Sequence, residues 1–146
     1  QKVEQVAFTV AEQEAGLAMH YELLENAEAI LRALELPYRV VQVCTGDIGQ
    51  GQVFKHDIET YMPARGGYFE THSCSFLADF QARRLNMRYE EGGKRPYVYT
   101  VNNTAAATPR LLIALLENHQ EKTGRVRIPG CLQPYMGRTH LEPRLK

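Results

Sequence analysis

Arg110 is the residue whose type and position point most directly to chemistry. It follows Thr108 and Pro109, a pair typical of a helix start, because a threonine hydroxyl can accept from free N–H groups and proline needs no donor at the first helical position. A cation there lies beside the positive end of the helix dipole, at a cost of about 0.3–1 kcal/mol unless an anion compensates it. Free N–H groups and a guanidinium together suit a phosphate. A salt bridge to a nearby carboxylate is the alternative, and these residues alone leave both open.

A second group of polar side chains ends the predicted strand Tyr68–Ser75. Glu70 and Ser73 offer hard oxygen ligands of the kind that hold Mg²⁺ together with phosphate, although hydroxyl groups at a strand end more often form hydrogen bonds within a turn. Because the two residues are three positions apart, a regular strand would direct them to opposite faces. Both can serve one metal only if the strand bulges or ends between Thr71 and Ser73.

Three further residues could bind a small polar molecule. Asn102 and Thr104 share the parity of a strand, so both can face one cavity and hold a hydroxyl group from two sides. Glu4 lies in the apolar strand Val3–Phe8, on the face opposite Val3. A single charged residue in such a strand is more often solvent-exposed than functional, and the residues alone favour that interpretation.

Hydrophobic periodicity predicts the elements that position these side chains. The expected strands are Val3–Phe8, Tyr38–Val43, His56–Met62, Tyr68–Ser75 and Tyr97–Val101, the last with Asn86–Tyr89 as its hairpin partner. The expected helices are Leu17–Leu34, a short one capped by Asp79, a buried one from Pro109 through the apolar run Leu111–Leu116, and Pro129–Gly137. A polar turn is expected between Val101 and Thr108. Hairpins with helices inserted between them predict an α+β domain with an antiparallel sheet flanked by helices.

Length and composition exclude several classes of protein. The chain has 146 residues, which suits one domain with a core, and its 17 basic and 17 acidic residues balance. Net charge therefore predicts neither nucleic-acid nor membrane binding. No apolar run is long enough to span a bilayer. The 3 cysteines are widely spaced and lack the spacing of a metal finger, which favours a reduced, cytoplasmic protein.

Several motifs together resemble the seryl-tRNA synthetase family of class II aminoacyl-tRNA synthetases. In that family's order and spacing they are Glu70-Thr71-His72-Ser73-Cys74-Ser75, Asp79-Phe80-Gln81-Ala82-Arg83-Arg84, Asn102-Asn103-Thr104 to Arg110, Leu115-Leu116-Glu117-Asn118-His119-Gln120, Ile128-Pro129 and Pro134-Tyr135-Met136-Gly137. Lys2-Val3-Glu4-Gln5 resembles the end of the family's second motif, and residues 100–117 resemble its third. The resemblance covers residues 1–137, the C-terminal portion of the catalytic domain from the end of motif 2 through motif 3. Residues 138–146 are then expected to be a loose basic tail.

On the substrate side, the resemblance implies that three residues bind serine. Glu4 corresponds to the glutamate that holds the ammonium group of serine, and Asn102 and Thr104 correspond to side chains around the serine hydroxyl. The implied activity is that of a ligase, which activates serine with ATP to seryl-adenylate and transfers the seryl group to tRNA(Ser).

On the nucleotide side, the resemblance assigns ATP binding to Glu70, Ser73 and Arg110. Glu70 and Ser73 correspond to positions near the metal and the phosphates, and Arg110 corresponds to the arginine that grips the γ-phosphate. Glu70 and Arg110 are therefore the expected catalytic residues, and ATP and Mg²⁺ are the expected cofactors.

The resemblance also implies partners and further parts. The family's tRNA-gripping arm, its motif 1 dimer helix and the first half of motif 2 have no counterpart in these 146 residues. The chain is therefore expected to be a piece of a homodimeric, cytoplasmic synthetase without a membrane partner, and to be inactive alone. A non-catalytic paralogue that acts as a binding protein and a class II-like ligase that charges a carrier protein remain as alternatives.

Other candidate residues are expected to be structural. Of Arg83 and Arg84, one is expected to brace the sheet and the other to be solvated, with a tRNA-binding patch as the alternative. Cys74 is expected to be a small core residue rather than a nucleophile. Three histidines that do not form a ligand set by spacing are expected to be structural as well: His56, His72 and His119.

Overall fold

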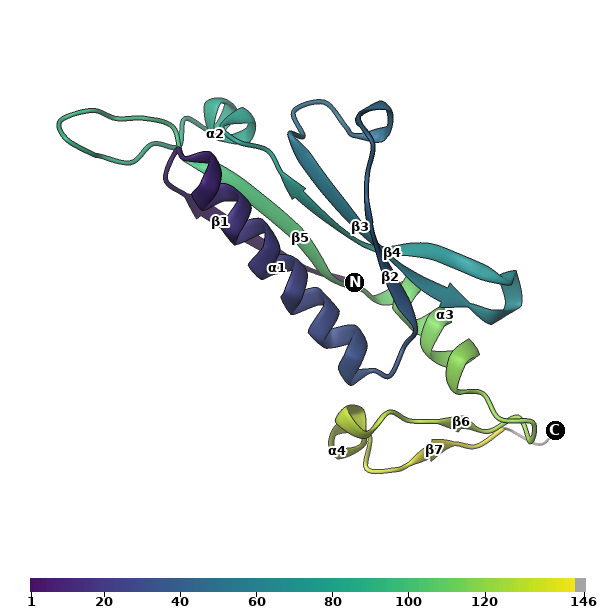
Figure 1. Ribbon diagram of the computed structural model, residues 1–146. Coiled ribbons are helices and arrows are strands. Elements are labelled where there is room, and N and C mark those ends of the chain that lie inside the picture. Colours follow the sequence, from purple (N-terminus) through teal and green to yellow (C-terminus); the bar gives the residue numbers. More distant parts are fainter. Residues whose placement is uncertain (144–146) are drawn as a thin grey trace.

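One five-stranded antiparallel sheet organises the part of the chain, residues 1–143, that the computed structural model describes (Figure 1). The strands are β1 (Lys2–Thr9), β2 (Tyr38–Gln42), β3 (Phe54–Met62), β4 (Gly67–Phe76) and β5 (Tyr99–Ala107). They lie in the order β1-β5-β4-β3-β2, and every neighbouring pair is antiparallel. The α+β class expected from the hairpin pattern is confirmed.

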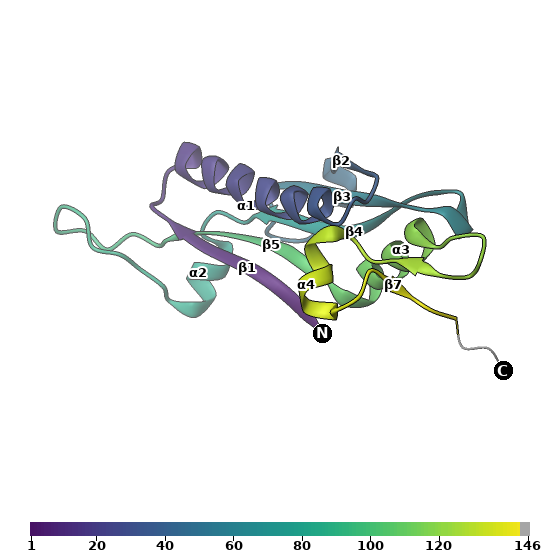
Figure 2. The same ribbon diagram turned by 90° about the horizontal axis from the view of Figure 1, so that it is seen from below.

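Helix α1 (Gln13–Ala33) covers one face of this sheet. Figure 2 shows α1 along one side of β1 and β5, with the short helix α2 (Phe80–Leu85) on the other side. Apolar residues at helical spacing turn one side of α1 toward the strands, and burying each large side chain contributes about 1.5–3 kcal/mol. The core between helix and sheet includes Leu24, Ala27, Leu31, Ile58, Phe76 and Val101.

Helix α3 (Thr108–His119) follows β5 directly, but it is not buried on every side as its apolar run predicts. Leu111 and Ala114 are buried, whereas Leu112 and Ile113 expose 54% and 48% of their surface. The helix contacts β3 and β5, the turn at Pro63–Arg65 and the short strand at Val126–Arg127, and these contacts leave part of its apolar surface uncovered. Its uniform apolarity therefore leaves an exposed apolar face.

Tertiary pairing overturns two local predictions around β5. The polar turn expected after Val101 does not form, because β5 continues through Ala107 along its ladder with β1. Thr108 is consequently the first helical residue rather than a cap, and its hydroxyl donates to the backbone oxygen of Gln1.

Asp79 does precede α2, but its carboxylate accepts from Arg83 instead of capping the helix.

The second hairpin and the C-terminal region are smaller than the main sheet. Residues 86–98 form the expected hairpin through isolated bridges only. After α3, β6 (Val126–Arg127) pairs with β7 (His140–Leu141), and the short helix α4 (Gln133–Met136) lies between them. The segment expected to be a loose tail therefore includes a paired strand, and residues 144–146 lie outside the described part. Within residues 1–143, no helix is both long and apolar enough to cross a membrane.

Candidate active site

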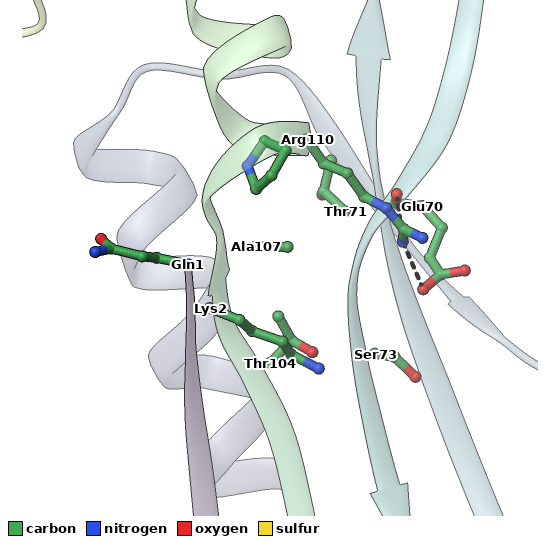
Figure 3. A pocket seen from close by; sticks show the side chains of 9 residues that line it. Gln1, Lys2, Glu70, Thr71, Ser73, Thr104, Ala107 and Arg110 are labelled. Carbon is green, nitrogen blue, oxygen red and sulfur yellow. Dashed lines mark hydrogen bonds and ion pairs between the residues drawn. The ribbon is translucent and has the colours of Figure 1, made fainter.

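Strands β4 and β5 separate partway along their length, and a cavity lies between them. Their ladder comprises only the pairs from Cys74–Asn103 to Phe76–Val101. Beyond this ladder an open cavity of about 560 Å³ is lined by β4, β5, the start of β1 and the first turn of α3 (Figure 3). Its lining residues are Gln1, Lys2, Glu70, Thr71, Ser73, Thr104, Ala107, Pro109 and Arg110.

Most of the residues that the sequence singled out meet at this cavity. Glu4 is the cross-strand partner of Thr104, so its side chain projects from the same face of the sheet. Asn102 also shares that face, but it lies further along β5, in register with Ser75, and does not line the cavity. The predicted residues that do line it are Glu70, Ser73, Thr104 and Arg110.

A bulge in β4 brings Glu70 and Ser73 to one face. The register of β3 against β4 skips Thr71, and one extra residue reverses the alternation of faces beyond it. The Thr71 hydroxyl is buried, with its Oγ1 2.7 Å from Oγ1 of Thr60 and 2.9 Å from Nδ1 of His72. The irregularity that a common metal site requires is therefore present, at Thr71.

A second bulge, in β5, shapes the opposite wall of the cavity. The register of β1 against β5 skips Ala105. As in β4, the extra residue allows two residues three positions apart, Thr104 and Ala107, to line the same cavity. The two bulges stand on opposite walls, where β4 and β5 part.

Arg110 and Glu70 meet at one end of the cavity (Figure 3). Nη1 of Arg110 lies 3.0 Å from Oε1 of Glu70 and 3.2 Å from its backbone oxygen. The side chains expose 53% and 44% of their surface, and an ion pair so exposed is worth about 0–1 kcal/mol. The carboxylate partner of the alternative interpretation is therefore present. The phosphate interpretation stays a prediction, and so weak an ion pair is compatible with it.

Lys2 is a cavity residue that sequence reasoning missed. Its Nζ lies 2.8 Å from Oε2 of Glu4. Lys2 therefore forms an ion pair with the carboxylate that is expected to bind the ammonium group of serine. A lysine two positions before a glutamate on one strand face is ordinary on a solvated surface. No local signal could therefore have identified it.

The cavity offers few ligands for a divalent cation. Among the described residues, no cluster of three or more His, Cys, Asp or Glu side chains could hold a metal. Glu70 and Ser73 supply one carboxylate and one hydroxyl on the same wall. This donor set fits Mg²⁺, which retains several waters and takes further oxygens from phosphates, and it does not fit Zn²⁺, which favours nitrogen and sulfur ligands.

The residues expected to be structural behave so, with one exception. Burial raises the pKa of the Cys74 thiol to about 12, which suits a core residue and not a nucleophile. His72 and His119 are buried, and Nε2 of His119 lies 2.9 Å from the backbone oxygen of Leu34. His56 is hydrogen-bonded to His20, with 2.9 Å between Nδ1 and Nε2.

The exception is the pair of arginines on α2, neither of which braces the sheet. Arg83 forms an ion pair with Asp79, with a distance of 2.6 Å from Nη2 to Oδ2. The guanidinium of Arg84 stacks on Phe80, 3.6 Å from the ring centroid. Both arginines are exposed. Beyond α2 and Asp79, the guanidinium of Arg83 also lies over the ring of Tyr97, 5.5 Å from the centroid.

Comparison with known proteins agrees with this geometry. A family profile for the tRNA synthetase class II core domain (G, H, P, S and T) matches residues 1–119. The serine–tRNA ligase of Deinococcus radiodurans is 56% identical over 137 residues, which cover 93% of this chain and 32% of that protein. The serine–tRNA ligase of Rubrobacter xylanophilus is 50% identical over 143 residues, which cover 97% of this chain and 33% of that protein.

Among solved structures, the crystal structure of seryl-tRNA synthetase from Pyrococcus horikoshii complexed with ATP is similar over 99% of this chain and 32% of its own, with a TM-score of 0.94 and 44% identity. The chain spans about a third of the length of the curated relatives it matches. The profile match over most of the chain and the likeness of the whole fold lead to one conclusion: this chain belongs to the class II tRNA synthetase core domain family.

Proposed function

We propose that the chain is the C-terminal part of the catalytic domain of a serine–tRNA ligase, which activates serine with ATP and transfers it to tRNA(Ser). The observation that carries the proposal is the cavity between β4 and β5, where a weakly paired arginine stands at one end and polar groups of β1 and β5 at the other. Support comes from relatives named serine–tRNA ligase and from a similar structure complexed with ATP.

At the nucleotide end, Arg110 exchanges Glu70 for the γ-phosphate of ATP. Glu70 and Ser73 would hold Mg²⁺, which when bound supplies further positive charge to the phosphates. The carboxylate of serine then attacks the α-phosphorus in line, and pyrophosphate leaves as seryl-adenylate forms. Such a reaction needs little covalent assistance, because holding the reactants in line and neutralising the spreading phosphate charge account for most of the acceleration.

At the serine end, Glu4 exchanges the ammonium of Lys2 for that of the amino acid. Asn102 and Thr104 hold the serine hydroxyl from two sides. Alanine would leave these polar groups unpaired in a closed site, at a cost of about 1–3 kcal/mol for each group. Discrimination against alanine therefore follows from polar groups on β5 and not from the size of the cavity.

The same proposal includes the partners of the whole protein. The seryl group passes from the adenylate to the terminal hydroxyl of tRNA(Ser), and the parts that grip this tRNA and join two protomers into a homodimer belong to the region outside this chain. The protein acts in the cytoplasm, where free cysteines such as Cys44 and Cys131 stay reduced.

Serine-dependent exchange of pyrophosphate into ATP tests the proposal on the full-length protein that carries this chain. Serine should support exchange, and alanine should support it at least about 10-fold less well, the factor expected from one unpaired polar group. Exchange that requires no serine, or no exchange at all, would contradict the proposal and favour a non-catalytic paralogue. Exchange without charging of tRNA(Ser), but with charging of a carrier protein, would favour the other ligase class.

A further inference from the structure

Two amide side chains from neighbouring strands, one half-buried and one fully buried, donate to one backbone carbonyl of α1. Nε2 of Gln5 in β1 lies 3.1 Å from the backbone oxygen of Leu23, and Nδ2 of Asn103 in β5 lies 2.6 Å from the same oxygen. Gln5 and Asn103 are register partners across the β1–β5 ladder. We call these two side chains and the Leu23 carbonyl the amide clamp. It joins the helix to both strands at Leu23, and Oε1 of Gln5 also accepts from Nδ2 of Asn26 in α1, 3.1 Å away.

The clamp lies directly behind the serine end of the cavity. Successive residues of a strand face opposite sides of the sheet. Glu4 precedes Gln5, and Asn102 and Thr104 flank Asn103, so each clamp residue faces α1 while its chain neighbours face the cavity side. The clamp touches none of the groups proposed to bind ATP, which stand on β4 and on the first turn of α3.

Stability alone does not account for Asn103. Its side chain is fully buried, and its Oδ1 has no hydrogen-bond partner among the described residues. A buried oxygen without a partner is destabilising, and an apolar side chain of similar shape would avoid it. What Asn103 adds to the structure is the donation to α1, and Gln5 adds the same donation from the next strand.

We propose that Gln5 and Asn103 are positioning residues for the amino acid substrate. The clamp fixes the positions of β1 and β5 relative to α1 and to each other. It therefore sets the distance between Glu4 on β1 and the side chains of Asn102 and Thr104 on β5. This assignment rests on the proposed function, because it concerns the KM for serine in that reaction. The assignment predicts that substitutions in the clamp change the KM for serine and leave the KM for ATP nearly unchanged.

The test compares Asn103→Ala and Gln5→Met in pyrophosphate exchange by the full-length protein. Asn103→Ala removes one hydrogen bond to α1. Gln5→Met removes the donation to Leu23 and also the acceptance from Asn26, while it keeps nearly the same length at a half-buried position. Each should raise the KM for serine by at least about 2- to 10-fold, the range expected for one hydrogen bond, while the KM for ATP stays within about 2-fold.

Val101→Ala is the matched control. Val101 is fully buried in β5 and faces α1, two residues before Asn103, but it has no part in the clamp. It should lower the thermal unfolding midpoint and leave both KM values unchanged. Equal changes in the two KM values of the clamp variants, or a serine KM in Val101→Ala that rises as much as in Asn103→Ala, would mean that the clamp is merely structural.

The two proposals fail in different ways. A wild-type protein without serine-dependent exchange contradicts the proposed function and this assignment with it. A wild-type protein with serine-dependent exchange, whose Gln5→Met and Asn103→Ala variants keep the normal KM for serine, contradicts the assignment alone.

Discussion

At the scale of single residues, one end of the cavity holds a weak, half-exposed ion pair. Arg110 and Glu70 are 3.0 Å apart, yet both are about half exposed, so water and salt screen their attraction. Lys2 and Glu4 form a second pair of this kind, 2.8 Å apart. In the proposed function, each pair keeps a charged side chain ready for the ligand group that would replace its internal partner. Little free energy is then lost when ligand groups replace the internal partners.

The first residue-scale prediction concerns Arg110. Arg110→Ala in the full-length protein should lower kcat/KM for ATP in pyrophosphate exchange by about 10²- to 10³-fold, because a preorganised positive charge at a phosphate contributes that much. Arg39→Ala is a suitable control, since Arg39 is an exposed partner of Glu59 on the sheet edge. An Arg110 variant as active as the Arg39 variant would exclude a role in phosphate binding.

At the scale of elements, close packing of α1 on the sheet positions the strands of the site. Gly16 allows this approach, because a Cβ at that position would lie 2.4 Å from Cε2 of Phe76. Phe76 is fully buried in β4, so its ring cannot move aside without opening the core. The register of β4, and with it the bulge at Thr71, depends on this layer.

Gly16→Ala is therefore expected to destabilise the protein although it improves helix propensity. The overpacked ring should cost about 1–3 kcal/mol, against a gain of about 1 kcal/mol from replacing glycine inside a helix. The thermal unfolding midpoint of the full-length protein measures the difference. Gly46→Ala is the control, because no atom lies within 4 Å of its Cβ position. Equal midpoints for the two variants would show that α1 is free to shift.

At the scale of the whole molecule, two buried histidines link folding to pH. Burial lowers the pKa of His72 to about 4, and burial together with the charge of His56 lowers the pKa of His20 to about 4. Both face the layer between α1 and the sheet and are fully buried. An unfolded chain takes up these protons near pH 6.5. The unfolded state therefore binds more protons between about pH 6.5 and 4, and stability must fall as the pH falls through this window.

The matching experiment follows unfolding of the full-length protein between pH 7 and pH 4. Each histidine should contribute a slope of up to about 1.4 kcal/mol per pH unit. His72→Asn should reduce the slope in that window, and His20→Asn should reduce it independently. A wild-type stability that stays constant from pH 6.5 to pH 4.5, or variants with the wild-type slope, would contradict the linkage.

The sequence by itself determined the parts of this protein that local physics controls. Alternation and helical periodicity predicted the strands of β1, β3 and β4, the helix α1 and the α+β class, because each signal depends on neighbours two to four residues apart. Chain parity and motif order also singled out candidate residues, of which Glu70, Ser73, Thr104 and Arg110 line one cavity. The three-residue spacing of Glu70 and Ser73 predicted that a strand must bulge if both serve one site. The same local view failed at residues 102–107, where the polar sequence predicts a turn and the ladder with β1 imposes a strand.

Only the tertiary structure decided how the site is assembled. The separation of β4 from β5, the position of Lys2 beside Glu4 and the amide clamp all join residues that are distant in the chain. The exposed face of α3 likewise depends on what packs nearby, not on its own sequence. Which strands pair, and in which register, depends on how the whole sheet packs against its helices. This packing joins residues that are far apart in the chain, so a short stretch of sequence cannot predict it.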